Sequence, residues 1–139
     1  MSNVPKGKRG ESSAEFLRMS RVVKLATVRN CTKIPKKYGF GLAQPMIATA
    51  TNAKTLIVYA NSIRPKNQRQ VQDRAESFEK AKAMLAALCS DIDDLQEMKD
   101  EISIASQVYD EWTAGVATLI VLLNGVMDSD RKRYKDLPD

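Results

Sequence analysis

The sequence predicts an all-α fold, an antiparallel up-down four-helix bundle that residues 1–139 form as a single domain. Three observations support this prediction. Apolar residues recur at steps of three and four along four stretches of the chain, which is typical of amphipathic helices. Prolines and capping residues separate these stretches by short connections, as between neighbouring helices of a bundle. The length of 139 residues and the hydrophobic share of 43% suit one modest core.

The first helix is expected to follow a basic tail, residues 1–11. Ser12 and Glu15 have the spacing of a capping box, so the helix should begin there. Its apolar stripe is formed by Phe16, Met19, Val23 and Ala26. The helix should end before Pro35, because a proline biases the preceding residue away from helical geometry. The connection 36–41 follows and contains two glycines.

The second helix is expected to start near Leu42, with Pro45 tolerated in its first turn. Its apolar stripe is formed by Met46, Ala50, Ala53, Ile57 and Ala60. The β-branched Thr and Val residues would also suit a strand. A period of two fits the apolar pattern poorly, however, so a helix is the better interpretation. The pair Arg64-Pro65 should end it.

The third helix is expected to begin at Asn67, which has capping-box spacing to Gln70. Its apolar seam is formed by Val71, Ala75, Phe78, Leu85, Cys89 and Ile92, with Leu88 and Leu95 beside it. The segment is rich in residues that favour helices and should run to about Met98.

The fourth helix is expected to begin with Ser103 or Ser106 as its cap. Its apolar seam is formed by Val108, Trp112, Val116, Leu119, Leu123 and Val126. The run 119–123 is apolar all round, which predicts burial on more than one side. Gly125 then ends the core pattern, and residues 128–139 form a charged C-terminal tail.

The apolar surface exceeds what one stripe per helix requires. In the first helix, Leu17, Val22, Leu25 and Val28 lie off the main stripe. Such a surplus predicts contacts between subunits, and therefore a homo-oligomer. A wide core-facing sector in a small bundle is the alternative explanation.

The composition argues against an enzyme and against a bound cofactor or metal. The chain has no histidine, the side chain most used for acid–base chemistry and metal binding near neutral pH. Two reduced structural thiols are the better interpretation of Cys31 and Cys89, although their spacing leaves a disulfide open. The acids between Asp91 and Glu101 lack the spacing of a calcium loop and are typical of a solvated helix end. The N-terminus has no apolar segment of a secretory signal, and no apolar run approaches about 20 residues, so we expect a cytoplasmic protein without a membrane partner.

Charge is distributed unevenly along the sequence. Residues 1–70 carry 14 Lys and Arg against two acids, whereas residues 71–111 carry 11 acids against four bases. Residues 112–139 carry four of each. A protein polarised in this way presents a basic and an acidic field, and the basic half is suited to a polyanion.

The basic residues of the first helix, and those at the helix ends, form the candidate site. Most of the former fall on one side of a helical wheel, and an antiparallel bundle could bring the latter together. They would hold the phosphates of RNA or DNA through salt-sensitive contacts that do not read sequence. The candidate contacts are Arg18, Arg21, Lys24, Arg29, Lys33, Lys36, Lys37, Arg64, Lys66 and Arg69. An ordinary solvated basic face is the alternative.

Scattered motifs across most of the chain carry a family resemblance. They are Val4-Pro5-Lys6, Lys8-Arg9, Ser12, Glu15-Phe16, Pro35-Lys36-Lys37-Tyr38, Phe40, Ala60-Asn61-Ser62-Ile63, Pro65, Asn67, Gly125-Val126-Met127 and Ser129-Asp130-Arg131. With them the chain resembles the small four-helix-bundle family of rRNA intervening-sequence proteins and of the accessory variability determinants of diversity-generating retroelements.

The resemblance implies a homopentameric barrel with a positively charged surface. It also implies two partners, the retroelement reverse transcriptase and its template RNA, and a role in supporting mutagenic cDNA synthesis without polymerase activity. The acidic stretch from Asp73 to Glu111 is less expected in a nucleic-acid-binding protein. Two alternatives therefore stay open: a structural or protein-interaction bundle that touches no nucleic acid, and an accessory DNA-binding bundle of a mobile element.

Overall fold

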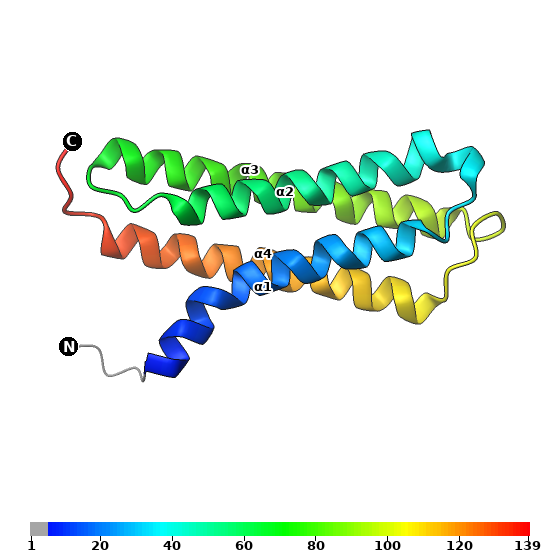
Figure 1. The fold of residues 1–139 in the computed structure, drawn as a ribbon, viewed down its shortest axis with the longest axis horizontal. Helices are drawn as coiled ribbons and strands as arrows, with labels where there is room; N and C mark the ends of the chain where they lie inside the picture. The colour runs from blue at the N-terminus through cyan, green and yellow to red at the C-terminus, as the bar shows by residue number, and fades with distance from the viewer. Residues whose placement is uncertain (1–5) are drawn as a thin grey trace.

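The computed structural model describes residues 6–139, with side chains from residue 15 onward, and this part of the chain is helical without strands. Its four α-helices are α1 (Lys6–Cys31), α2 (Gln44–Ser62), α3 (Gln68–Glu97) and α4 (Ser106–Arg133). A 3-10 turn, η1 (Lys36–Tyr38), and a π-helical turn, η2 (Gly39–Ala43), connect α1 to α2. The helices lie side by side, with α1 and α3 each packed against both α2 and α4 (Figure 1). The predicted all-helical, bundle-like fold is confirmed.

The core lies along the centre of the four helices. In α2 the five residues of the predicted stripe, Met46 to Ala60, are the five that are buried. The rings of Phe16 and Phe78 meet edge to face across α1 and α3, with centroids 5.9 Å apart. In α3 the seam is buried from Phe78 to Leu95, whereas Val71, Ala75 and Cys89 of the predicted seam are only half-buried. The period of three to four residues therefore located the buried faces.

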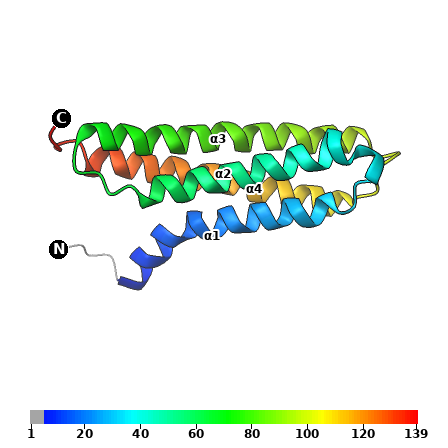
Figure 2. The same cartoon turned by 45° about the horizontal axis from the view of Figure 1, so that its top comes forward.

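The start of α1 differs from the prediction. The helix begins at Lys6, six residues before Ser12, so the predicted capping box does not mark its N-terminus. Serine is only modestly less favourable than alanine in a helix, so Ser12 can lie within one. Between residues 6 and 12, only the two glycines disfavour a helix more strongly. Residues 6–11 of the expected basic tail are thus helical, while residues 1–5 lie outside the described range. Figure 2 shows this N-terminal part of α1 diverging from the other helices.

The boundaries of α4 also correct the prediction. Ala105 occupies the cap position without a side-chain hydrogen bond, so neither predicted serine is the cap. The helix continues through Gly125 to Arg133 and takes in the first half of the expected C-terminal tail. A methyl group at Gly115 would lie 3.9 Å from Val23 Cγ2, and one at Gly125 would meet nothing within 4 Å.

The apolar run 119–123 in α4 is buried over a wide sector, because Ile120 and Leu122 are half-buried against the core on either side of Leu119, but it is not buried all round. Leu119 and Leu123 are in the core, but Val121 is 67% exposed. A helix turns about 100° per residue, so a residue two positions from both points away from them. The prediction of burial on more than one side therefore holds for Leu119, Ile120, Leu122 and Leu123 and fails for Val121 in the single chain.

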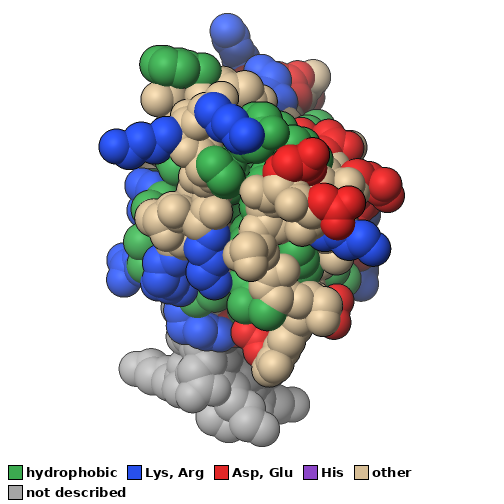
Figure 3. Space-filling model, turned by 90° about the vertical axis from the view of Figure 1, so that its right-hand side faces the viewer, with side chains coloured by type: hydrophobic (Ala, Val, Ile, Leu, Met, Phe, Trp, Pro, Cys, Tyr) green, Lys and Arg blue, Asp and Glu red, His purple; other side chains and the backbone are tan. Residues whose placement is uncertain are grey.

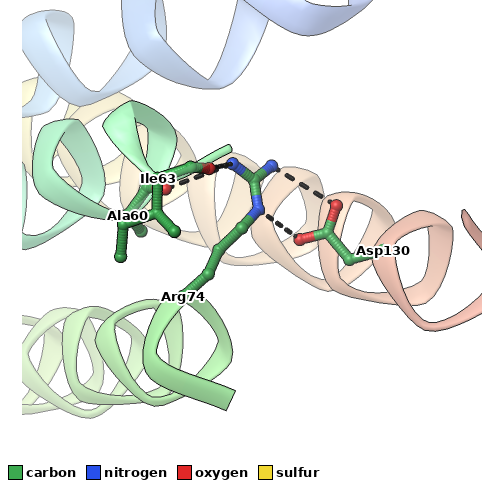
Figure 4. Close-up of polar contacts among 4 residues, drawn as sticks. All are labelled: Ala60, Ile63, Arg74 and Asp130. Carbon is green, nitrogen blue, oxygen red and sulfur yellow. Dashed lines mark hydrogen bonds and ion pairs between the residues drawn. The ribbon is translucent and has the colours of Figure 1, made fainter. Parts of the chain in front are cut away.

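Two buried polar contacts tie the helices together. The Trp112 indole N–H donates to Thr27 Oγ1 at 3.0 Å, and the Thr27 hydroxyl donates to the Val23 carbonyl at 2.8 Å. The second contact is a buried ion pair: Arg74 Nε donates to Asp130 Oδ2 at 2.6 Å, joining α3 to α4. Arg74 Nη1 also donates to the carbonyls of Ala60 and Ile63, at 3.1 and 3.2 Å (Figure 4).

The structure bears on two further predictions, the N-cap of α3 and the pairing of the two cysteines. The Gln70 backbone N–H donates to Asn67 Oδ1 at 2.9 Å, which confirms Asn67 as the N-cap. Cys31 and Cys89 are both free thiols. Cys31 is buried, and this burial raises its pKa to about 11.

Candidate nucleic-acid interface

The exposed face of α1 carries three of the predicted arginines. Phe16, Val23 and other residues of the stripe face the core, so Arg18, Arg21 and Arg29 lie on the solvent side. Lys24, at the edge of this face, is half-buried. The sequence had predicted this arrangement from the helical period alone.

Arg18 has an acidic neighbour on the same helix. Its Nη2 lies 2.7 Å from Glu15 Oε1, and its Nε donates to Glu15 Oε2 at 3.2 Å. The hydrogen bonds from Arg18 lower the pKa of the Glu15 carboxyl. The ion pair with Glu15 therefore partly neutralises the charge of Arg18 in the absence of a ligand.

Lys33, Lys36 and Lys37 are exposed in the connection that follows α1. Lys33 lies two residues beyond the end of the helix, so it does not belong to the helical wheel on which it was predicted. The Lys37 ammonium lies 5.1 Å from the centre of the Tyr38 ring.

The remaining predicted contacts, Arg64, Lys66 and Arg69, are exposed at the opposite end of α2. The 19 residues of α2 separate them from the lysines of η1. At 1.5 Å per residue, that helix is about 28 Å long. The expectation that antiparallel packing would bring these two groups together is wrong. The lysines of η1 lie before the start of α2 and the other three residues lie after its end, so the length of the helix separates them (Figure 1).

Charges of opposite sign occupy different sides of the molecule. Figure 3 shows the end of the bundle that carries the α1–α2 and α3–α4 connections, with most Lys and Arg on one side and most Asp and Glu on the other. Among the ten candidate residues, only Arg18 forms an ion pair with another side chain of residues 15–139. The other nine candidate cations therefore have no carboxylate partner within residues 15–139.

The acidic side is formed by the end of α3 and the turn after it. Burial, and then the neighbouring Asp94, raise the pKa of Asp91. Among the described residues, no three Cys, Asp or Glu side chains are arranged to hold a metal ion.

The sequence interpretation missed a second source of cations, the segment after Ser129. The Gln68 side-chain amide at the start of α3 donates to the carbonyls of Tyr134 and Leu137, at 2.8 and 3.0 Å. The Gln68 backbone N–H donates to the Pro138 carbonyl at 2.7 Å. The basic residues 131–135 are thereby held beside the α2–α3 connection. Their run in the sequence was visible, but its neighbours in space were not.

Large apolar side chains are also exposed. Phe40, in η2, is 84% exposed, and Tyr59 on α2 is 54% exposed. Val22 and Leu25 lie among the arginines of α1, at 38% and 43% exposed. The outer surface of the α1–α2 half is thus basic with apolar residues interspersed.

By length and composition alone, α4 is apolar enough to cross a membrane. The mean hydropathy of its most apolar 18-residue window is 1.3, and 28% of that window is buried. Trp112, Val116 and Leu119 of this helix contribute to the bundle core, as expected of the core helix of a bundle.

No protein-family model matches the chain. No curated protein and no solved structure gives a match either.

Proposed function

We propose that this chain is a non-enzymatic, nucleic-acid-binding four-helix bundle that contacts phosphates through the basic surface of its α1–α2 half. The observation that carries the proposal is a set of cations without carboxylate partners, which lie on α1, in the connections at both ends of α2 and at the start of α3 and are all exposed except the half-buried Lys24. Nine of the ten candidate cations form no ion pair with any side chain of residues 15–139. A polyanion would supply the missing partners and release counterions, which favours binding at low salt.

The resemblance stated from the sequence motifs extends this proposal to a biological setting. The chain would serve as the accessory protein of a diversity-generating retroelement, binding a reverse transcriptase and its template RNA to support mutagenic cDNA synthesis. It would be an antiparallel up-down bundle that assembles as a homo-oligomer, pentameric if the resemblance holds. Contacts such as Trp112 with Thr27, from the start of α4 to the end of α1, support opposite helix directions. The exposed Val121 supports a further subunit.

The first test is charge reversal on α1. We expect the double variant Arg21→Glu and Arg29→Glu to bind a labelled RNA hairpin at least tenfold more weakly than the wild type. The plot of log affinity against log salt should also be shallower, by about 0.7–0.9 for each phosphate that the variant no longer neutralises. Fluorescence anisotropy between about 50 and 200 mM salt measures both quantities.

Lys80→Glu with Lys99→Glu is the matched control, because both lysines are exposed within the acidic region of the sequence. The control should retain near wild-type affinity after correction for the same change in net charge. If the α1 variant and the control lose affinity equally, the α1 surface is not the site. Nucleic-acid-free wild-type protein that fails to bind RNA and DNA at low salt would contradict the function itself.

The second candidate is a protein-interaction bundle without a nucleic-acid role. The exposed Phe40 and Tyr59 favour it, because large aromatic side chains are enriched at protein interfaces. A protein of this kind would show no salt-dependent RNA binding. Phe40→Ser would then weaken partner binding, whereas the α1 variant would not.

A further inference from the structure

The C-terminal segment is held in a defined place on the start of α3. Gln68 is the first residue of α3, and its side-chain amide donates to the carbonyls of Tyr134, Lys135 and Leu137, at 2.8, 3.4 and 3.0 Å. Its backbone N–H donates to the Pro138 carbonyl at 2.7 Å. Because the first N–H groups of a helix lack partners within the helix, this contact also satisfies the N-terminus of α3.

A buried contact farther along α3 fixes the same arrangement more deeply. Arg74 on α3 and Asp130 on α4 form a two-bond ion pair, with side chains 9% and 11% exposed. The same guanidinium donates to two carbonyls at the end of α2 (Figure 4). The last turn of α4, the first turns of α3 and the α2–α3 connection are therefore joined as one unit.

This unit gathers basic residues from two distant parts of the sequence, which we name the end patch. Its members are Arg64, Lys66, Arg69, Lys132, Arg133 and Lys135. All six are exposed, and none forms an ion pair with a side chain of residues 15–139. Of the four acids in residues 128–139, Asp128 is paired with Arg131 and Asp130 with Arg74, which leaves Asp136 and Asp139.

Helix electrostatics explain only part of this patch. Lys132 and Arg133 lie in the last turn of α4, where cations stabilise the negative end of the helix dipole. Arg64, Lys66 and Arg69 lie at the N-terminus of α3, where the dipole disfavours cations, and the first turn of that helix contains no acid. A bound anion would reduce both the repulsion among these cations and their unfavourable interaction with the helix dipole.

We propose that the end patch binds the phosphate backbone of a nucleic acid, with Gln68 as a positioning residue that keeps the C-terminal cations beside those of the α2–α3 connection. This inference rests on the proposed function and extends its surface to residues 132–135. Lys132, Arg133 and Lys135 contact phosphates alongside Arg64, Lys66 and Arg69. Gln68 touches no phosphate and acts through the backbone carbonyls that it holds.

The test compares three variants of the full chain on the same labelled RNA hairpin. Lys132→Gln, Arg133→Gln and Lys135→Gln together should weaken binding at least tenfold. The salt slope should become shallower by about 0.7–0.9 for each phosphate left without its cation. Gln68→Met keeps the charge and nearly the size of the side chain but removes its donors, so it should also make the slope shallower. Lys80→Gln with Lys99→Gln is the control and should change neither quantity.

The outcomes separate the end patch from the proposed function. Wild-type binding that the triple variant leaves unchanged in affinity and slope overturns the end patch alone, and the function then rests on α1. A Gln68→Met slope equal to that of the wild type removes the positioning role. Wild-type protein that binds no nucleic acid overturns both proposals, and retention of an acidic protein by the patch in that case would assign it to another partner. Circular dichroism of each variant separates loss of binding from loss of fold.

Discussion

The Arg74 guanidinium lies in a largely dehydrated position, where it reaches Asp130 and two backbone carbonyls. A buried ion pair of this kind contributes modestly to stability, because both charges lose their hydration. Removing only one partner is far more damaging, since it leaves a buried charge without compensation. The pair therefore specifies how α2, α3 and α4 meet more than how tightly they pack.

We predict that Arg74→Met alone destabilises the fold by about 3–5 kcal/mol, because Asp130 is left buried and unpaired. The double variant Arg74→Met with Asp130→Leu should recover much of that loss. Urea denaturation of both single variants, the double variant and the wild type measures the coupling between the two positions. Simple additivity of the single effects would contradict the importance of the pair.

Cys31 gives the fold a dependence on alkaline pH. Burial raises its pKa from an ordinary 9.0 to about 11, so the folded state holds the proton longer than the unfolded state. Stability is thus fully present below pH 9 and falls as the pH rises from about 9 to about 11, where the unfolded thiol ionises first. Denaturation midpoints across this window should fall less in Cys31→Ala than in the wild type. The partial pKa increase of Tyr109 acts in both proteins and cancels in the comparison.

Among the helices, α3 has the clearest boundary. Asn67 Oδ1 accepts the Gln70 N–H, and the Gln70 side chain accepts the Lys66 N–H at 2.7 Å, so two backbone donors are satisfied at once. No side chain performs this task at the start of α4. The stability of the N-terminus of α3 therefore depends on capping side chains, whereas that of α4 does not.

We predict that Asn67→Ala destabilises the protein by about 0.5–2 kcal/mol, the usual effect of removing an N-cap. Asn52→Ala, at an exposed position within α2, is the control and should have almost no effect. Thermal unfolding followed by circular dichroism compares them. Equal losses in the two variants would mean that the cap contributes nothing specific.

Features of this fold that depend on local spacing could be predicted from the sequence, whereas contacts between distant segments could not. The stripe of α2 and the Asn67 cap follow from local spacing, which is why both were found. Arg74 also lies on the apolar seam, one helical step before Phe78, and Asp130 lies three residues after Met127. Their positions signalled burial, but their pairing depends on how α3 and α4 pack. The same limit applies to Gln68, whose carbonyl partners lie at least 66 residues away.

Across the whole molecule, the uneven charge of the sequence becomes a division between two sides. The basic residues come mainly from α1, from the connections at both ends of α2 and from the end of α4, whereas the acids are concentrated on α3 and in the turn after it. A polyanion approaching this molecule is attracted to one side and repelled by the other, so it should bind in a restricted set of orientations.

The exposed apolar residues predict an assembly larger than one chain. After a high-salt wash to remove nucleic acid, light scattering should give a mass above that of one chain, and a mass of about five subunits is what the proposed retroelement role implies. Val121→Glu with Val58→Glu should lower that mass, because both side chains are exposed in the single chain and lie outside the arginine face of α1. Gln96→Glu is the control at an exposed position of α3. A monomeric wild type would show that the surplus apolar surface has no role between subunits.

Gly115 and Gly125 bear on how far this protein could change. Each sits inside a long helix, where glycine is about 1 kcal/mol less favourable than alanine. Neither is required by its surroundings, since a methyl group would meet only ordinary contact at one site and open space at the other. Replacing each of these glycines by alanine should therefore stabilise the fold without changing any surface charge. A lineage that made these replacements could tolerate more variation on its basic surface before its fold failed.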